Sequence, residues 1–179
     1  LAANLSENSI AGLRRFLNEY PLDREPGSRF EYSTVGFGAL GICLAEKCES
    51  GSFEDCLRKK VLAPLEMSSS VFELPAALQA RFAGETLPKP RAEGPNPFNA
   101  SGGLISSAHD LLQLVSANLD AKSRPQLAKA ITLSQQTDPN IKAFAGSIAG
   151  LGWFALESSK VYFHSGIGSE FRAFIAFDL

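Results

Sequence analysis

The chain has 179 residues, which is enough for one ordinary domain with a hydrophobic core. Its 45% hydrophobic and 20% charged residues are typical of a globular domain, and a net charge of -2 provides no basic field for nucleic acid or anionic lipid. No apolar run approaches the length that crosses a membrane. We therefore expect a globular domain with no nucleic-acid partner and no transmembrane segment.

The first predicted element is a helix over residues 6–20. Ile10, Leu13 and Leu17 recur at helical spacing, and Pro21 ends the pattern. Nothing in this segment points to chemistry, so we interpret it as a packing helix.

Residues 26–41, which read PGSRFEYSTVGFGALG, place a tyrosine immediately before a second helix. The Pro-Gly pair predicts a turn, and the hydroxyl of Ser33 or Thr34 is suited to accept a free backbone N–H in the first helical turn. Apolar residues surround most of this helix, which predicts that it is buried. Tyr32 then lies at the mouth of a buried helix. On position alone, a core tyrosine whose hydroxyl bonds to a carbonyl group is the commoner explanation.

The third predicted helix begins after Ser52. Glu54 and Asp55 place acidic side chains in its first turn, where they interact favourably with the helix dipole. The pattern reaches about Val61 and breaks before Pro64.

Three cysteines, Cys43, Cys48 and Cys56, lie close together in sequence. Their number is odd, and no second cluster completes a zinc site. We interpret them as mostly unpaired thiols, with a disulfide between Cys48 and Cys56 as the alternative. The sequence therefore leaves the redox compartment open.

The middle of the chain contains a proline-rich segment followed by a helix. Residues 84–100 carry four prolines and two glycines, so they form either a surface linker or the lining of a pocket. Ser107 and Asp110 then make a capping-box pattern at the start of the helix. His109 lies in its first turn as a solvated or capping residue, and we give it no catalytic role.

Strands are expected from Gly150 onward. Apolar residues predict them over residues 151–156, 161–164 and 171–177, and the short links between them predict antiparallel neighbours. The third strand is apolar on both faces apart from Arg172, as expected of a central strand that is covered on both sides.

These elements predict one α+β unit within a single domain segment. Residues 1–149 form a mainly helical region, in which residues 118–146 are the least readable part, and residues 150–179 form antiparallel strands. We expect the active cleft to lie between the two regions.

Four segments occur in the order that is typical of one protein family. They are PGSRFEYSTVGFGALG at residues 26–41, VLAPLEMSSSVF at residues 61–72, SGGLISSAHDLLQLVSAN at residues 101–118 and GLGWFALESSKVYFHSGIGSEFRAFIAFD at residues 150–178. They resemble the Tyr-x-Asn, Pro-Leu-Gly-Met, Gly-Gly-Leu and Lys-Thr-Gly or His-Thr-Gly regions of class C β-lactamases and penicillin-recognising serine hydrolases, a superfamily that includes D-alanyl-D-alanine carboxypeptidases and esterases. The resemblance implies a β-lactamase/transpeptidase-like α+β fold, with a helical region and part of an antiparallel sheet, incomplete at both ends.

The resemblance gives catalytic roles to Tyr32 and His164. In this family a serine of a Ser-x-x-Lys motif attacks a carbonyl group and forms an acyl-enzyme. By resemblance, Tyr32 exchanges protons with that serine and with the leaving group, and His164 stabilises the charge state of Tyr32. A histidine at a strand end can take up and release a proton, although in isolation it is more often a surface residue beside a turn. The two side chains should lie within a few ångströms of each other.

Four further positions bind substrate by the same resemblance. Ser165, in the His-Ser-Gly triplet with Gly166, is expected to hydrogen-bond a polar group or carboxylate of the substrate. The backbone N–H of Ile167 is expected to be one donor of the oxyanion hole. Thr34 stands where the family has asparagine and cannot make a two-ended amide contact. This lowers the expectation of efficient β-lactam hydrolysis and leaves esterase and D-peptidase activity equally favoured.

The nucleophile of this mechanism is missing from the sequence. No Ser-x-x-Lys occurs between Leu1 and Leu179, and Gly-x-Ser-x-Gly is absent as well. We expect the chain to be an interior segment of a longer serine hydrolase, because the family carries the motif upstream of the tyrosine region. The alternative is a relative that has lost its nucleophile and serves as a binding or regulatory module.

No metal or organic cofactor is expected, because the two histidines lie far apart and no paired carboxylates stand near them. The expected partner is a small-molecule or peptide substrate. The resemblance favours a periplasmic or extracellular location, and the residues say nothing of the oligomeric state.

Overall fold

The computed structural model describes residues 9–88, 96–157, 159–168 and 170–179. It combines helices with one antiparallel sheet, which confirms the predicted α+β class. The helical elements are α1 (Ile10–Glu19), α2 (Thr34–Cys48), α3 (Phe53–Leu57) with its continuation η2 (Arg58–Leu62), α4 (Ala76–Gln79), η3 (Asn99–Ser101), α5 (Ala108–Leu119), η4 (Ala121–Ser123) and α6 (Ala128–Ser134). The strands are β1 (Thr137–Lys142), β2 (Ser147–Gly150), β3 (Phe154–Leu156), β4 (Val161–Ile167) and β5 (Arg172–Asp178).

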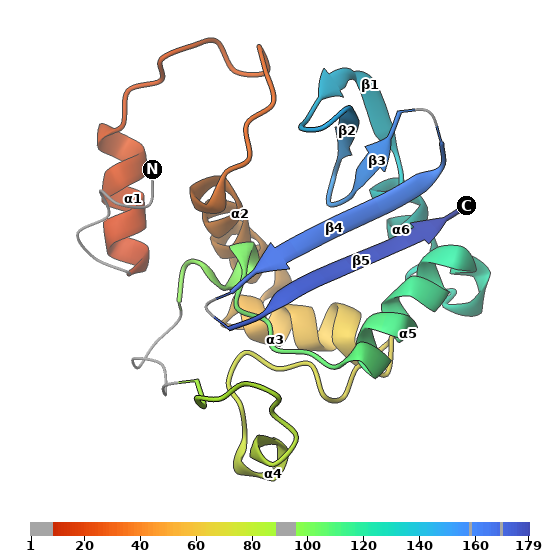
Figure 1. The fold of residues 1–179 in the computed structure, drawn as a ribbon. Coiled ribbons are helices and arrows are strands. Elements are labelled where there is room, and N and C mark those ends of the chain that lie inside the picture. The colour runs from red at the N-terminus through yellow and green to blue at the C-terminus, as the bar shows by residue number, and fades with distance from the viewer. Residues whose placement is uncertain (1–8, 89–95, 158, 169) are drawn as a thin grey trace.

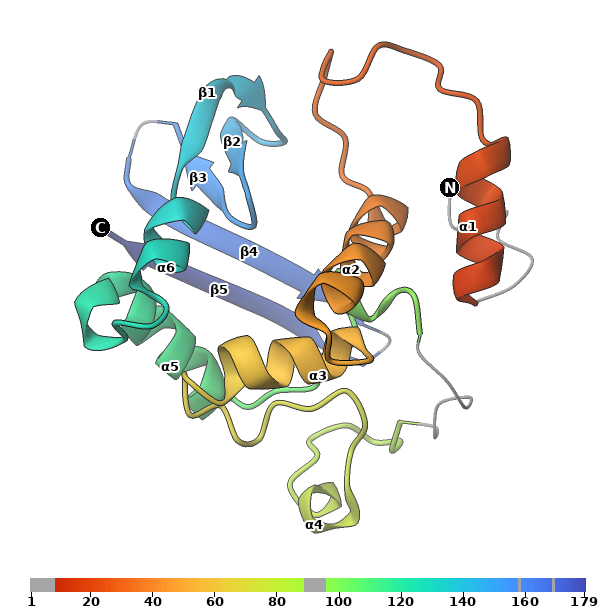
Figure 2. The same cartoon turned by 180° about the vertical axis from the view of Figure 1, so that it is seen from behind.

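The strand order in the sheet follows the chain from β1 to β5, and β4 and β5 form its longest pair (Figure 1). Seen from behind, α6 lies over one end of the β4–β5 pair and α3 and α5 lie along its β5 side, whereas α1 and α4 lie away from the sheet (Figure 2). None of the helices in these ranges is long and apolar enough to cross a membrane.

Serine side chains begin the helices that the sequence predicts. The Ser33 Oγ accepts the backbone N–H of Gly36 at 2.9 Å, so Ser33 rather than Thr34 is the cap of α2. The Ser107 Oγ accepts the backbone N–H of Asp110 at 3.2 Å at the start of α5. Each serine satisfies a helix N–H that has no partner within the helix.

The main buried cluster joins the end of η2 to α5 and α6. Its members are Leu62, Leu65, Met67, Ala117 and Ile131. Three of them come from the VLAPLEM stretch, so this family marker is a packing element, in keeping with its apolar composition.

Asp110 fastens the stretch that follows Met67 to the start of α5. Its side chain is only 1% exposed, and one carboxylate oxygen accepts the Ser69 N–H at 2.9 Å and the Ser70 Oγ hydrogen at 2.7 Å. The capping-box pattern predicts that this carboxylate turns back toward Ser107, but it hydrogen-bonds across to another segment. A buried carboxylate requires such donors, because an unpaired buried charge is very costly.

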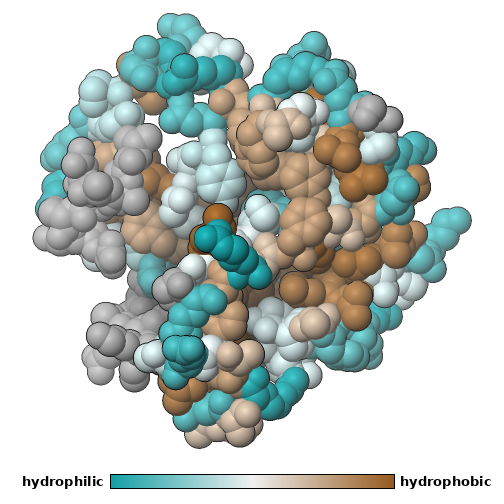
Figure 3. Space-filling model, in the orientation of Figure 1, coloured by the Kyte–Doolittle hydropathy of each residue, from teal (hydrophilic) through white to brown (hydrophobic). Residues whose placement is uncertain are grey.

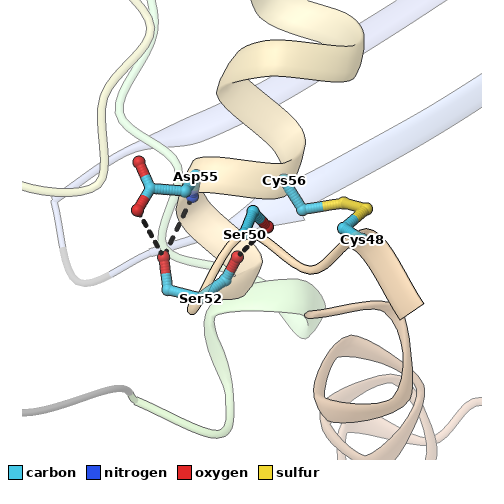
Figure 4. Close-up of a disulfide and its surroundings, with 5 residues drawn as sticks. All are labelled: Cys48, Ser50, Ser52, Asp55 and Cys56. Carbon is cyan, nitrogen blue, oxygen red and sulfur yellow. Dashed lines mark hydrogen bonds between the residues drawn. A yellow bond between two sulfur atoms is a disulfide. The ribbon is translucent and has the colours of Figure 1, made fainter. Parts of the chain in front are cut away.

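A disulfide links Cys48 at the end of α2 to Cys56 in α3, with their Cα atoms 5.8 Å apart (Figure 4). The interpretation of the cysteines as mostly unpaired thiols is therefore wrong for two of them, and the alternative pairing holds. Cys43 is free and exposed. Sequence spacing alone did not reveal that the turn after α2 returns Cys56 to the end of that helix.

The same turn is held by polar contacts. Ser52 caps α3 by accepting the Asp55 N–H at 3.1 Å, and the Ser50 Oγ donates to the Ser52 carbonyl at 3.1 Å (Figure 4). Arg58 hydrogen-bonds to the Asp55 carboxylate at 2.6 Å, which holds the pKa of that carboxyl below its usual value.

Reduction of this disulfide should destabilise the protein by about 2.5 kcal/mol, the loop-closure entropy for cysteines eight positions apart. Urea unfolding of the C48S/C56S variant, compared with the wild type, measures the loss. Cys43→Ser is the matched control, because an exposed thiol contributes under about 0.5 kcal/mol. Equal stability of the double variant and the control would contradict the structural role of the disulfide.

Helix α2 is less buried than its composition predicts. Val35, Gly38 and Gly41 are its buried residues, whereas Phe37 and Leu40 are 44% and 48% exposed. A Cβ atom added at Gly41 would collide with the Ala100 side chain, so the glycine face is the one that packs closely on η3. The close approach uses small residues, and this leaves larger apolar side chains on the other faces.

The sheet begins earlier than the sequence predicts. Strand β1 starts at Thr137 and β2 at Ser147, both within the region expected to be mainly helical up to residue 149. Strand β1 reads TDPNIK and is almost wholly exposed, so it has no apolar alternation by which it could be recognised.

Strand β5 was expected to be central, and in the structure it is an edge strand that pairs only with β4 among the described residues. Phe177 is its one buried residue, and Phe174 is 69% exposed. Apolar side chains gather over β4 and β5 on the face seen in Figure 3. Within the described residues, β5 therefore has one strand partner and one buried side chain.

Candidate functional site

Tyr32 and His164 lie side by side although they are far apart in sequence. Tyr32 directly precedes the Ser33 cap of α2, and His164 lies in β4. Their ring centroids are 6.4 Å apart, with the ring planes tilted by 45°. The Tyr32 side chain is 56% exposed, so it is not the buried core tyrosine that position alone favours. The start of α2 and strand β4 thus bring two groups able to exchange protons to one place.

The tautomer of His164 follows from its hydrogen bond. Its Nδ1 lies 2.9 Å from the backbone carbonyl oxygen of Ser165, and a carbonyl oxygen only accepts. Nδ1 therefore carries the hydrogen. In the neutral ring Nε2 is then an acceptor, and it can take up a hydrogen bond or a proton.

An aromatic cluster supports the histidine ring. Phe154 in β3 is 6% exposed, and its ring centroid lies 5.4 Å from that of His164 and 5.9 Å from that of Phe30. The ring centroid of Phe144 lies 4.6 Å from that of Phe154. Because Phe30 belongs to the segment that carries Tyr32, this cluster joins the tyrosine segment to the sheet. Sequence reasoning missed these phenylalanines, since an apolar strand residue gives no sign that it touches a site.

The backbone N–H of Ile167 is directed away from β5. In the pairing of these strands, Ile167 is opposite Arg172, and the next pair is closed by the Gly168 N–H, which donates to the Phe171 carbonyl at 2.8 Å. Hydrogen-bonded and non-hydrogen-bonded pairs alternate in an antiparallel ladder, so the pair of Ile167 is a non-hydrogen-bonded one. Its N–H is therefore directed away from β5 and is available to another acceptor.

The remaining predicted positions are accessible. Ser165 and Gly166 are exposed near the end of β4, and Ile167 is 76% exposed. Strand β3 pairs with β4 only at Tyr162 and Phe163, so in the part of the chain that the structure describes the outer edge of β4 beyond Phe163 has no strand partner. An open strand edge offers backbone donors and acceptors to a ligand.

Thr34 is exposed as the first residue of α2, two positions after Tyr32. A cavity of about 340 Å³ lies elsewhere, between α1, the second half of α2 and the start of α3. Its lining includes Ile42, Ala45 and Phe53. The Tyr32 and His164 pair is therefore an open surface site separate from that cavity.

No metal site accompanies the pair. Over the described ranges, no group of three or more histidine, cysteine, aspartate or glutamate side chains is placed to hold a metal ion. His109, at the start of α5, is exposed. The chemistry offered by the residues in hand is proton exchange and hydrogen bonding.

Comparison with known proteins identifies the family. The family model described as Beta-lactamase matches residues 2–179. The human protein named "Putative beta-lactamase-like 1" is 30% identical over 137 residues, which are 72% of this chain and 27% of that protein. "Protein flp" of Staphylococcus aureus (strain NCTC 8325 / PS 47) is 25% identical, over 95% of this chain and 36% of its own length.

The fold is similar to that of solved class C β-lactamases. One such structure has a TM-score of 0.78 at 19% identity, and the match covers 97% of this chain and 55% of that chain. A class C β-lactamase in complex with cefoxitin also has a TM-score of 0.78 at 19% identity, with 97% and 57% covered. The chain thus spans about a third of the length of the curated relatives and just over half of these structures.

The family match over nearly the whole chain and the shared fold agree with the order of the four motifs and with the meeting of Tyr32 and His164. The chain belongs to the beta-lactamase family.

Proposed function

We propose that this chain carries the tyrosine-and-histidine half of a serine hydrolase active site. A serine outside this segment attacks the carbonyl carbon of an ester, a D-amino-acid peptide or a β-lactam, and water then hydrolyses the acyl-enzyme. The observation that carries the proposal is the 6.4 Å separation between the ring centroids of Tyr32 and His164. Membership of the beta-lactamase family supports the same reaction class.

Tyr32 is the proton carrier in this proposal. Its phenolic oxygen takes the proton of the serine hydroxyl as that serine bonds to the carbonyl carbon, and it returns a proton to the leaving group when the tetrahedral intermediate collapses. The exposed position of the side chain leaves room for both partners. His164 stabilises the charge state of Tyr32, and its Nε2 is the ring atom left free by the bond to the Ser165 carbonyl.

The end of β4 binds the substrate in this proposal. The Ile167 N–H donates to the oxyanion that forms on the substrate carbonyl, and the N–H of the nucleophilic serine is the second donor. Gly166 leaves the strand edge unobstructed, and the Ser165 hydroxyl hydrogen-bonds a polar group or carboxylate of the substrate. Thr34, at the start of α2, contacts the substrate with a hydroxyl in place of an amide.

An ester or a D-amino-acid peptide is the favoured substrate, because a threonine at position 34 offers a single hydroxyl where an amide would offer a donor and an acceptor. A β-lactam is the less favoured third class. The Cys48–Cys56 disulfide supports an oxidising compartment, in keeping with a periplasmic or extracellular location.

A non-catalytic binding or regulatory module is the second candidate. The observation in its favour is that no Ser-x-x-Lys occurs within residues 1–179. Such a module would bind a substrate-like ligand at the Tyr32 and β4 surface without turnover.

Turnover of three chromogenic substrates by the full-length protein distinguishes the candidates. An aryl ester, a D-alanyl-D-alanine peptide and nitrocefin represent the three classes. We expect hydrolysis of the ester or the peptide at a kcat of about 1 s⁻¹ or more, and slower hydrolysis of nitrocefin. Binding of all three without turnover of any would overturn the enzyme proposal in favour of the binding module.

A further inference from the structure

Residues 82–86, here called the support segment, lie against the turn between β4 and β5. The rings of Phe82 and Phe171 meet edge to face, with their centroids 5.3 Å apart and their planes at 75°. A Cβ added at Gly84 would collide with the Glu170 carboxylate and with the Phe82 ring, and it would lie 2.9 Å from the Phe171 ring. The Thr86 N–H donates a long hydrogen bond, 3.4 Å, to Glu170. Three separate contacts thus join these segments.

The turn that receives these contacts follows Ile167 directly. One backbone bond closes it, from the Gly168 N–H to the Phe171 carbonyl. Gly166 and Gly168 flank Ile167, and glycine permits a wider range of backbone conformations than any other residue. Ile167 is 76% exposed, so its own side chain fixes the backbone little. Ile167 is held in the ladder between the Gly166–Ala173 pair and the Gly168–Phe171 bond, so the direction of its N–H depends in part on how firmly the turn end of the ladder is held.

We propose that the support segment positions the Ile167 N–H through this turn, as a positioning element of the reaction proposed above, on which the inference rests. The contacts of Phe82 and Gly84 lead to Phe171 and Glu170, through which the segment acts on the turn. Gly84 packs against the ends of the Phe82, Glu170 and Phe171 side chains, so a side chain at this position would have to displace them.

The expected effect is kinetic. An oxyanion-hole N–H stabilises the transition state more than bound substrate, so its misplacement lowers kcat and leaves KM nearly unchanged. Removal of such a donor costs about 10²- to 10³-fold in kcat, and a misplaced donor costs part of that. We expect F82A to lower kcat about 10-fold.

The test uses the full-length protein, with F82A, F171A, the F82A/F171A double variant and the ring-conserving F82Y. We expect F82A and F171A to lower kcat by about the same factor, because each removes the same contact between the two rings. The double variant should then be no worse than either single variant. F82Y, which keeps the ring, should be close to the wild type. Hydrogen exchange of a peptide that spans the turn should be faster in F82A. Active-site titration corrects for unfolded protein.

Tyr162→Ala is the matched control. Tyr162 stacks on Phe177 at 5.4 Å in the same pair of strands, at the end opposite Ile167. We expect this variant to leave the exchange of the turn and kcat per active site unchanged. Equal effects of Y162A and F82A on both readouts, or an F82A enzyme with unchanged kcat and exchange, would overturn the inference. Absence of turnover in the wild type would overturn the proposed function. In that case the hydrogen exchange of the turn still tests the support segment, and unchanged exchange in F82A would count against it.

Discussion

Tyr32→Phe is expected to lower kcat of the full-length protein by about 10²- to 10⁴-fold, the usual contribution of a positioned proton-transfer group. The substitution removes only the phenolic hydroxyl. The ring remains to pack beside His164, at the 6.4 Å centroid separation of the wild type. Because the side chain is exposed, the loss of its hydroxyl leaves no buried group without a partner.

Steady-state kinetics and thermal unfolding of the same sample give the measurement and its check. Tyr20→Phe is the matched control, because Tyr20 is also a partly exposed tyrosine that stacks on a ring, that of Phe16 at 4.9 Å. We expect Y20F to retain the wild-type kcat. A Y32F enzyme within a factor of three of the wild type would remove Tyr32 from the catalytic machinery.

Asp110→Ala is expected to cost about 3 kcal/mol of unfolding free energy. The substitution removes the acceptor of the Ser69 N–H and the Ser70 hydroxyl, and each buried donor without a partner costs about 1–3 kcal/mol. Asp110→Asn keeps one carbonyl acceptor and should cost about half as much. The measurement is urea unfolding with linear extrapolation.

The control for this series is Asp23→Ala. Asp23 makes an exposed ion pair with Arg24 at 2.8 Å, and such pairs contribute under about 1 kcal/mol. A D110A variant as stable as D23A would contradict the anchoring role. If D110A does not fold, D110N measures the same acceptor in a milder form. D110N must then be less stable than both the wild type and D23A for the anchoring role to stand.

The local features of the fold were predictable from sequence, since they depend on neighbouring residues. Ser107 caps its helix because its hydroxyl reaches an N–H three positions on, and the short links predicted that β4 and β5 pair as neighbours. Features set by distant partners were not. The exposure of α2 depends on the approach of Ala100 to Gly41, and the early start of the sheet depends on the pairing of β1 with β2.

The site divides in the same way. The motif order predicted that Tyr32 and His164 meet, because the family pattern carries information on their contact that neither residue carries alone. Phe154 and Phe82 could not be predicted as parts of the site or its support, because an aromatic residue in an apolar stretch gives the same signal wherever its ring ends up. The roles of all six site residues stay predictions, namely those of Tyr32, His164, Thr34, Ser165, Gly166 and Ile167.

Peptide mapping by mass spectrometry, after the full-length protein reacts with a fluorophosphonate probe, tests the central claim most directly. A single adduct on a serine of a Ser-x-x-Lys motif outside residues 1–179, formed more slowly in Y32F, is the result that the proposal predicts. A folded full-length protein that forms no serine adduct with the probe or with a penicillin would contradict the acyl-enzyme mechanism and identify the chain as part of a binding module.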